Sequence, residues 1–215
     1  MKQLLKKEFR LAASPLSFFF IAFGCMAMLP GYPIVLGGFF VCLGLFQSFQ
    51  SAREAGDILY TAMLPVSKVT VVSAKFLFSV TIELIAFCLM AVLTGLRMAF
   101  LADAEVYLQN SLLNANLAFL GWVLMLFAAF NGLFIGGFFR TAYKIGIPFL
   151  SFGIVAAVVV TLSEALGYFP GMAGLKSTGF APVQLVILGI GIGLYLAITA
   201  VSYFRSVANF ERIDL

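Results

Sequence analysis

The chain has 215 residues, of which 63% are hydrophobic and 10% charged, whereas a soluble domain has about 45–50% apolar and about 25% charged residues. A water-soluble fold could not bury so much apolar surface, and the mean hydropathy of +1.10 agrees. The chain has no histidine and a net charge of only +4, which excludes His-dependent catalytic triads and gives little support to nucleic-acid binding.

Motifs for cofactors are also missing from the sequence. Cys25, Cys42 and Cys88 lie in apolar stretches without CxxC spacing, so we expect packing residues, with no disulfide and no metal site. Residues 174–177 contain Gly-Leu-Lys-Ser but lack the glycine that precedes lysine in a P-loop. We therefore expect no catalytic, cofactor-binding or metal-binding residues in this chain. Any ATP-driven work would depend on ATP and Mg²⁺ bound by a partner.

The first expected element is an interfacial helix over residues 1–14. Gln3, Lys6, Lys7 and Arg10 recur at i, i+3, i+4 and i+7, with apolar residues on another face. Such a helix lies on a membrane surface with its lysines toward anionic headgroups. A signal peptide over residues 1–29 is the alternative, although no A-x-A cleavage site follows.

Six apolar segments are expected to span the membrane. A spanning helix needs about 20 apolar residues, and residues 76–96, 117–139, 145–162 and 183–204 meet or approach that length. Residues 16–29 and 34–49 are shorter, and the turn-forming sequence Pro30-Gly31-Tyr32-Pro33 separates them. We expect two short helices joined by a tight outer hairpin.

The distribution of basic residues favours an even number of spans. With six spans and both termini in the cytoplasm, eleven of the thirteen Lys and Arg residues lie inside, and only Arg97 and Lys176 lie outside. This asymmetry follows the positive-inside rule. The expected fold is therefore an all-α, multi-pass protein of the cell membrane with six transmembrane helices.

Residues 51–75 form the longest expected cytoplasmic segment, and residues 52–64 have the pattern of an amphipathic helix. Its apolar face consists of Ala55, Ile58, Leu59, Ala62 and Met63. The helix is expected to end at Pro65, after which Ser67 can cap a helix that continues into the third span. By pattern alone, this helix could equally lie on the membrane surface.

The segment resembles the first intracellular loop of ABC type 2 permeases, the membrane subunits of type V ABC exporters. Arg53-Glu54-Ala55-Gly56 resembles the acidic-Gly element of that family, Leu64-Pro65-Val66-Ser67-Lys68 resembles its Leu-Pro-Val-Ser-Arg/Lys stretch, and Lys75 resembles its later lysine. The amphipathic N-terminus, the six expected spans and the missing ATPase motif are similar too. With its short outer loops, the chain resembles the small permeases of peptide and bacteriocin-type exporters, including the exporter of phenol-soluble modulins, more than the larger members of the family.

The resemblance implies that residues 52–64 are a coupling helix, seated in a groove of an ABC ATPase subunit and transmitting its movement to the spans. The implied coupling residues are Arg53, Glu54, Asp57, Ile58, Leu59, Ala62, Met63 and Pro65, and the charged ones would pair across the interface. A second permease copy, identical or related, and membrane lipid are the other implied partners. The implied function is a bacterial plasma-membrane permease that exports an amphipathic peptide or a lipid-like substrate.

Two other functions remain open. The substrate-binding subunit of a vitamin importer is also small and six-spanning, but it would not need the amphipathic helix at residues 52–64. A membrane enzyme should have clustered polar residues within its spans, whereas Glu83 is an isolated charge.

Glu83 is expected to act either as a gate or cavity-lining residue, or in a structural pair with a basic residue. Asn131 is expected to form a hydrogen bond across helices, and Gly132 with Gly136 and Gly189 with Gly193 are expected to allow close helix packing. For residues 163–181, the composition leaves short re-entrant helices and a simple loop open.

Overall fold

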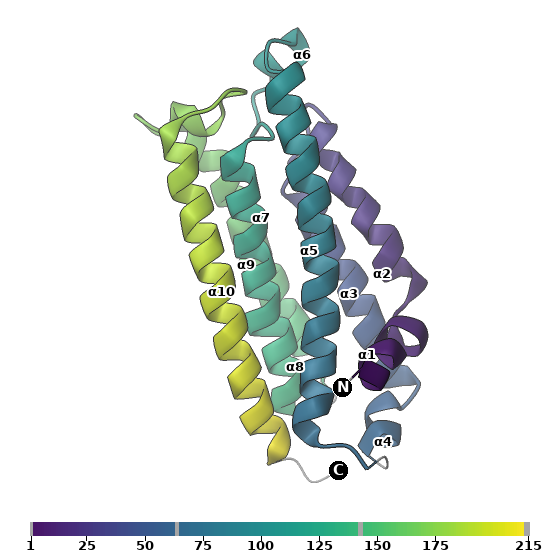
Figure 1. Ribbon diagram of the computed structural model, residues 1–215. Helices are drawn as coiled ribbons and strands as arrows, with labels where there is room; N and C mark the ends of the chain where they lie inside the picture. The colour runs from purple at the N-terminus through teal and green to yellow at the C-terminus, as the bar shows by residue number, and fades with distance from the viewer. Residues whose placement is uncertain (1, 63–64, 142–143, 213–215) are drawn as a thin grey trace.

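The computed structural model describes residues 2–62, 65–141 and 144–212, without the side chains of Lys2, Leu11, Ala12, Ile58, Leu59 and Ala62. Met63, an expected coupling residue, therefore lies outside the described residues. The described residues form helices and no strand, which confirms the all-α class. The helices form an elongated bundle, in which α1, α4 and the end of α10 lie at one end and α6 at the other (Figure 1). We call these the basic end and the α6 end.

The N-terminal region consists of two arms that meet at an angle. The first arm is α1 (Lys2–Lys7), which continues as a π-helical turn, η1 (Glu8–Ala12). The second arm is α2 (Pro15–Phe19) with a 3-10 helix, η2 (Phe20–Met28), and the two arms are bent by 83°. Ser14 separates them because its hydroxyl accepts a hydrogen bond from the Leu16 amide and caps the second arm.

The second arm packs against α3 (Leu36–Glu54). The connecting turn uses Gly31, whose φ of 69° suits glycine. Polar contacts join the two helices inside the bundle, since the Ser17 hydroxyl donates to the Gly44 carbonyl at 2.5 Å and the Ser14 amide donates to the Ser48 hydroxyl at 2.8 Å. The α3 helix continues to residue 54, beyond the expected boundary at residue 49.

The segment after α3 differs from the continuous helix expected over residues 52–64. Arg53 and Glu54 end α3, and a separate short helix, α4 (Asp57–Ala62), follows. The break lies at Gly56, because its φ of 64° is left-handed and incompatible with a continuous α-helix. The expected cap is confirmed: the Ser67 hydroxyl accepts from the Thr70 amide at 3.2 Å and begins α5 (Lys68–Phe100).

The rest of the chain forms three long helical units and short connections. The first unit is α7 (Leu117–Ala129), a π-helical segment η3 (Phe130–Ile135) and α8 (Gly136–Thr141). The other two are α9 (Gly146–Ala165) and α10 (Pro182–Glu211). The connections contain α6 (Glu105–Leu108) and two 3-10 helices, η4 (Leu166–Tyr168) and η5 (Ala173–Leu175). Residues 163–181 thus contain the end of α9 and two helices of three residues each, and no re-entrant helix longer than these begins among them.

Four helices among the described residues are long and apolar enough to cross a membrane. They are Lys68–Phe100, Leu117–Thr141, Gly146–Tyr168 and Pro182–Glu211. A fifth is added if the bent pair Gln3–Arg10 and Pro15–Met28 is one span. The α3 helix is not among them, because Gln47, Gln50 and the charged residues at its end lower its hydropathy. Four to five candidate spans are therefore shown, and six remain a prediction.

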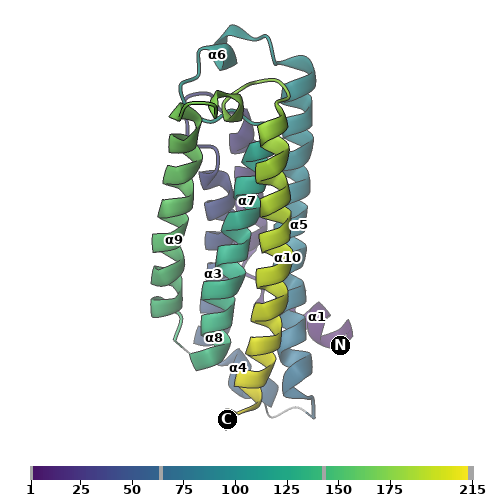
Figure 2. The ribbon, with the colours of Figure 1, turned by 90° about the vertical axis from the view of Figure 1, so that its left-hand side faces the viewer.

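The α7 helix lies at the centre of the bundle, with α9 and α10 on either side of it in Figure 2. Gly121 explains its closest contact, since a Cβ atom there would lie 2.5 Å from the Ile187 carbonyl oxygen of α10. The expected Gly132 and Gly136 also face α10, next to Ile198 and Ser202. Gly189 and Gly193 do not make a close contact within the described part of the chain, because no atom outside their own helix backbone lies within 4 Å of a Cβ at either position.

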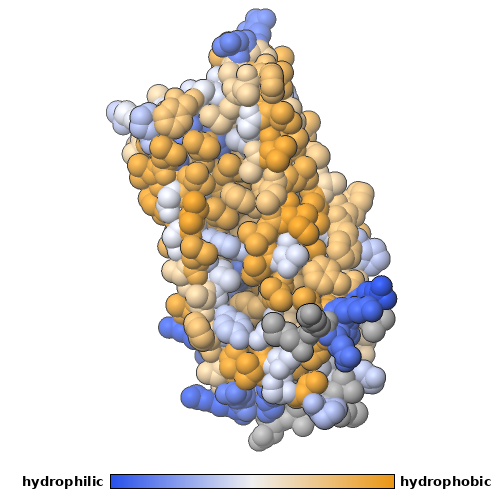
Figure 3. All heavy atoms as spheres, viewed as in Figure 1, coloured by the Kyte–Doolittle hydropathy of each residue, from blue (hydrophilic) through white to orange (hydrophobic). Residues whose placement is uncertain are grey.

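The two basic residues expected outside lie together at the α6 end. The Arg97 guanidinium donates to the Ala27 carbonyl at 2.7 Å and to the Asn114 side chain at 2.5 Å. The Lys176 ammonium donates to the Ser111 carbonyl. Hydrophobic residues cover the middle of the face seen in Figure 3, and hydrophilic residues gather toward its ends. This surface is typical of a protein with lipid around its middle.

Candidate coupling and intramembrane sites

Four charged side chains meet at the basic end. Lys7 and Glu8 come from the N-terminal arm, Asp57 is the first residue of α4, and Lys75 lies two turns into α5. Lys75 Nζ is 3.0 Å from Glu8 Oε2 and 3.2 Å from Asp57 Oδ2, and Lys7 Nζ is 2.5 Å from Asp57 Oδ1. We call these four residues the four-charge cluster, and it joins three separate elements.

The cluster is largely shielded from solvent. The exposed fractions of the Glu8 and Lys75 side chains are 3% and 4%, and that of Asp57 is 11%. Thr61 extends the network, because its hydroxyl accepts from Lys7 Nζ at 2.7 Å and donates to the Asp57 carbonyl at 2.6 Å. Burial acts to raise the pKa of Asp57, but the charges and hydrogen bonds of Lys75 and Lys7 outweigh it and lower that pKa.

The expected coupling residues fall into two groups. Arg53, Glu54 and Pro65 are exposed at the basic end, and Glu54 accepts a hydrogen bond only from Gln50 of its own helix, at 3.0 Å, among the described residues. Asp57 forms ion pairs with Lys7 and Lys75 within the chain, and its pairing with a partner subunit stays a prediction. Ile58, Leu59 and Ala62 belong to the backbone of α4, and their side chains lie outside the described part of the structure.

A second polar group lies in the middle of the bundle. Glu83 of α5 is fully buried, and its Oε2 accepts from Asn131 Nδ2 at 3.0 Å and from the Tyr195 hydroxyl at 2.8 Å. Asn131 Nδ2 also donates to the Thr199 hydroxyl at 3.0 Å. We call Glu83, Asn131, Tyr195 and Thr199 the core polar cluster. It confirms that Asn131 bonds across helices and joins α5, η3 and α10.

The surroundings of Glu83 contain polar partners but no basic residue in the described part of the chain. Within the described residues, no Lys or Arg forms an ion pair with Glu83, so the structural pair with a basic residue is not present. Glu83 Oε1 and Asn131 Oδ1 have no hydrogen-bond partner in the described structure. A buried oxygen without a hydrogen-bond partner raises the free energy of the folded state. The two oxygens can therefore gain hydrogen bonds if the helices around the cluster shift.

The backbone beside the core polar cluster is irregular. Asn131 lies in the π-helical segment η3, and its carbonyl accepts from the Ser202 hydroxyl of α10 at 2.6 Å. A π-helical turn widens the backbone and frees carbonyl groups, and such turns are frequent at functional sites. The irregular segment therefore lies at the same level of the bundle as Glu83, the one acidic side chain at the core of the described spans.

Several members of the two clusters were not predicted as site residues. They are Lys7, Glu8, Thr61, Tyr195 and Thr199. The sequence pattern places Lys7 only on the polar face of an interfacial helix, and tyrosine and threonine are common in membrane helices. For Tyr195 and Thr199, the one feature of the sequence that could have indicated a shared site is their spacing. They lie one turn apart on α10, and both face α5 and η3.

The comparison with protein families gives one result. The family model of ABC-2 family transporter proteins matches residues 3–211. The chain therefore belongs to the ABC-2 family of transporter proteins. Members are membrane transport subunits, typically without an ATPase site of their own, and they generally work with an ABC ATPase subunit. Neither the curated proteins nor the solved structures include a significant match.

Proposed function

We propose that this chain is the permease subunit of a bacterial ABC exporter in the plasma membrane, and that α4 is its coupling helix. The observation that carries the proposal is the four-charge cluster, which fastens the short helix α4 to the long helix α5. The ATPase subunit would bind ATP and Mg²⁺, and a second permease copy, identical or related, would complete the transporter.

The proposed topology has six spans, with the basic end in the cytoplasm. Under the positive-inside rule, the end that holds most of the basic residues faces the cytoplasm. The bend of 83° between the N-terminal arms supports an interfacial helix in the membrane plane followed by a short first span. The hydrogen bonds of Ser14 and Ser17 to α3 support pairing of this span with α3 as the second.

The α5 helix supplies a rigid path from α4 to the core. Lys75 and Glu83 lie eight residues apart on it, which corresponds to about 12 Å along the axis. A movement of α4 pulls on Asp57 and Lys75, because a buried ion pair resists separation. The same helix carries Glu83, which holds Asn131 and Tyr195. Tilting α5 would therefore strain the hydrogen bonds that join α5 to η3 and to α10.

The proposed cargo is an amphipathic peptide or a lipid-like molecule. The bundle interior is rich in phenylalanine, and the core polar cluster supplies few polar groups to receive a sugar or nucleotide. An apolar path lowers the desolvation cost only for a largely apolar cargo. The substrate-binding subunit of a vitamin importer remains the alternative, but the four-charge cluster around α4 favours the permease.

Purification of the chain from its native membrane tests the proposal. We expect an ABC ATPase to co-purify and its ATP hydrolysis to respond to amphipathic helical peptides, with little response to hydrophilic sugars. In a variant without Cys25, Cys42 and Cys88, a cysteine at Tyr60 should resist an impermeant thiol reagent, whereas one at Val106 should react. Labelling of Tyr60→Cys in intact cells, or purification without any ATPase, would contradict the proposal.

A further inference from the structure

A lateral groove opens in the basic half of the bundle, outside both clusters. It has a volume of about 920 Å³ and lies between η3–α8, the start of α9 and the second half of α10. Known ligand sites have volumes of about 300–1,000 Å³, so the groove is large enough for one ligand. Ile147 and Val201 on its walls are 73% and 49% exposed, which leaves the groove open to the side.

The groove has an apolar part and a basic part. Leu133, Ile198 and Val201 line the apolar part together with Gly132 and Gly136. Arg140, Lys144, Arg205 and Asn209 line the end nearest the basic end of the bundle. The lining residues include no Asp or Glu. The groove is therefore amphipathic, with a positive potential at one end.

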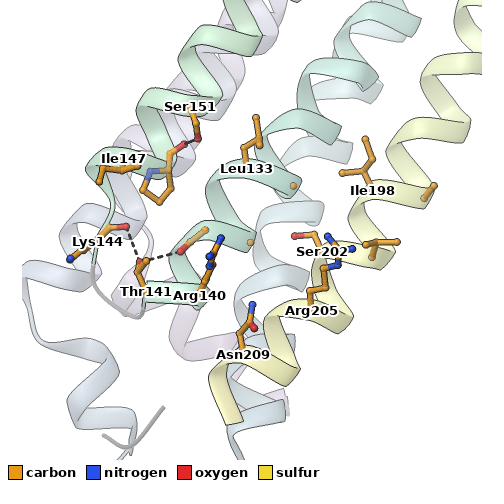
Figure 4. A pocket seen from close by; sticks show the side chains of 16 residues that line it. Leu133, Arg140, Thr141, Lys144, Ile147, Ser151, Ile198, Ser202, Arg205 and Asn209 are labelled. Atoms are coloured by element: carbon orange, nitrogen blue, oxygen red, sulfur yellow. Dashed lines mark hydrogen bonds between the residues drawn. The ribbon is translucent and has the colours of Figure 1, made fainter. Parts of the chain in front are cut away.

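Arg140 and Arg205 extend into the space between α8 and α10, while the Lys144 side chain points away from them (Figure 4). Within the described ranges, neither arginine forms an ion pair. Two guanidinium groups facing one space repel each other unless an anion lies between them, and their planar donors suit phosphate oxygens. The charge of the groove thus selects an anionic group.

The length of the groove matches one leaflet of a bilayer. Along α10, the lining extends from Ala197 to Asn209, and these twelve steps correspond to about 18 Å. Half of a hydrocarbon core of about 30 Å is about 15 Å. The apolar part would then lie at the depth of acyl chains, and Arg140 and Arg205 at the depth of phosphates.

We propose that the groove binds one anionic phospholipid from the leaflet at the basic end. Its phosphate lies between Arg140 and Arg205, and an acyl chain follows the surface of Gly132, Gly136 and Ile198. The site uses residues of this chain alone, and it requires only that the bundle sits in a membrane. It is therefore independent of the proposed ATPase and of the cargo.

Native mass spectrometry of the purified chain tests this site with phosphatidylglycerol and phosphatidylcholine of the same acyl chains. We expect one phosphatidylglycerol to bind in preference to phosphatidylcholine. Arg140→Gln with Arg205→Gln should weaken that binding by about tenfold or more, because two charge-assisted hydrogen-bonding groups are lost. Arg140→Lys with Arg205→Lys should retain part of the preference.

Two controls are needed. One tests whether any loss of surface charge has the same effect, and the other tests whether the acyl chain contributes to binding as well as the phosphate. Arg10→Gln with Arg53→Gln removes the same charge from exposed positions at the same end and should leave the preference unchanged. Ala197→Trp fills the apolar part from an exposed position and should weaken lipid binding, whereas a site for free phosphate would be unaffected by it. All four variants replace exposed residues, and their thermal unfolding in detergent shows whether they fold.

Three results would overturn the proposal. The first is equal binding of the two lipids by the unmodified chain. The second is an equal loss of preference in the groove variant and in its surface control. The third is a groove covered by a second copy of the chain, which would appear as efficient disulfide cross-linking between copies through Val201→Cys together with no bound phosphatidylglycerol.

Discussion

Lys75 Nζ lies 3.2 Å from Asp57 Oδ2, so a side chain two turns into α5 holds the first residue of α4. The same ammonium lies 3.0 Å from Glu8 Oε2, which adds the N-terminal arm to the contact. Three elements at the basic end are therefore joined through a single buried cation. Any force applied to α4 reaches α5 and the N-terminal arm together.

Replacement of Lys75 by methionine should destabilise the fold. It leaves the carboxylates of Glu8 and Asp57 with fewer partners in a shielded site, and breaking a buried ion pair costs about 3–5 kcal/mol. The free energy of unfolding in detergent measures this loss. The control is Lys6→Met at an exposed position, which should change stability by no more than about 0.5 kcal/mol. Equal effects of the two substitutions would show that the four-charge cluster does not contribute to the free energy of unfolding.

The contribution of Asp57 to stability should depend on pH. Its pKa lies below the ordinary value of 3.8 in the folded chain, because the charges of Lys75 and Lys7 outweigh the opposing effect of burial. Its ionised form therefore stabilises the fold above pH 3.8, and this stabilisation is lost as the pH falls through the lower folded pKa. The stability difference between the unmodified chain and Asp57→Asn should shrink below that pH. A difference that stays constant under acid conditions would refute the pairing.

Glu83 should be more sensitive to loss of its oxygen atoms than to loss of its charge. Glu83→Leu removes the acceptor of Asn131 Nδ2 and of the Tyr195 hydroxyl. Asn131 keeps its bond to Thr199, whereas the Tyr195 hydroxyl loses its described acceptor, so the substitution should cost about 1–3 kcal/mol. Glu83→Gln retains an acceptor of the same shape and should lie closer to the unmodified chain. Unfolding measurements on both variants compare them directly. Equal stability of Glu83→Leu and the unmodified chain would exclude the core polar cluster as a structural joint.

Gly121 should tolerate alanine poorly. The added Cβ would lie 2.5 Å from the Ile187 carbonyl oxygen, which forces α7 and α10 apart, and overpacking of this kind costs about 1–3 kcal/mol. Gly189→Ala is the matched control, because no atom lies within 4 Å of its Cβ. Thermal unfolding of the two variants should therefore differ. The close approach of α7 to α10 would be contradicted if both unfolded at the same temperature.

The general class of this fold follows from the sequence because apolar length and helix propensity are local properties. The long helices and the Ser67 cap are examples, since each depends on residues close together in the chain. The break at Gly56 and the choice of Gly121 over Gly189 depend on long-range packing, which periodicity does not encode. In the same way, Glu83 was a candidate from composition, but its partners Asn131 and Tyr195 come from helices distant in sequence.

Coupling through α4 is the central claim, and co-purification of the ATPase tests it most directly. The decisive variant is Ile58→Asp with Leu59→Asp, which places two charges on α4, where a groove contact would bury apolar surface. Its matched control is Val106→Asp with Leu108→Asp, which changes two exposed apolar residues of α6 at the opposite end. We predict that the α4 variant inserts normally but loses the ATPase, while the α6 variant retains it. Retention of the ATPase by the α4 variant, with transport unchanged, would contradict the claim.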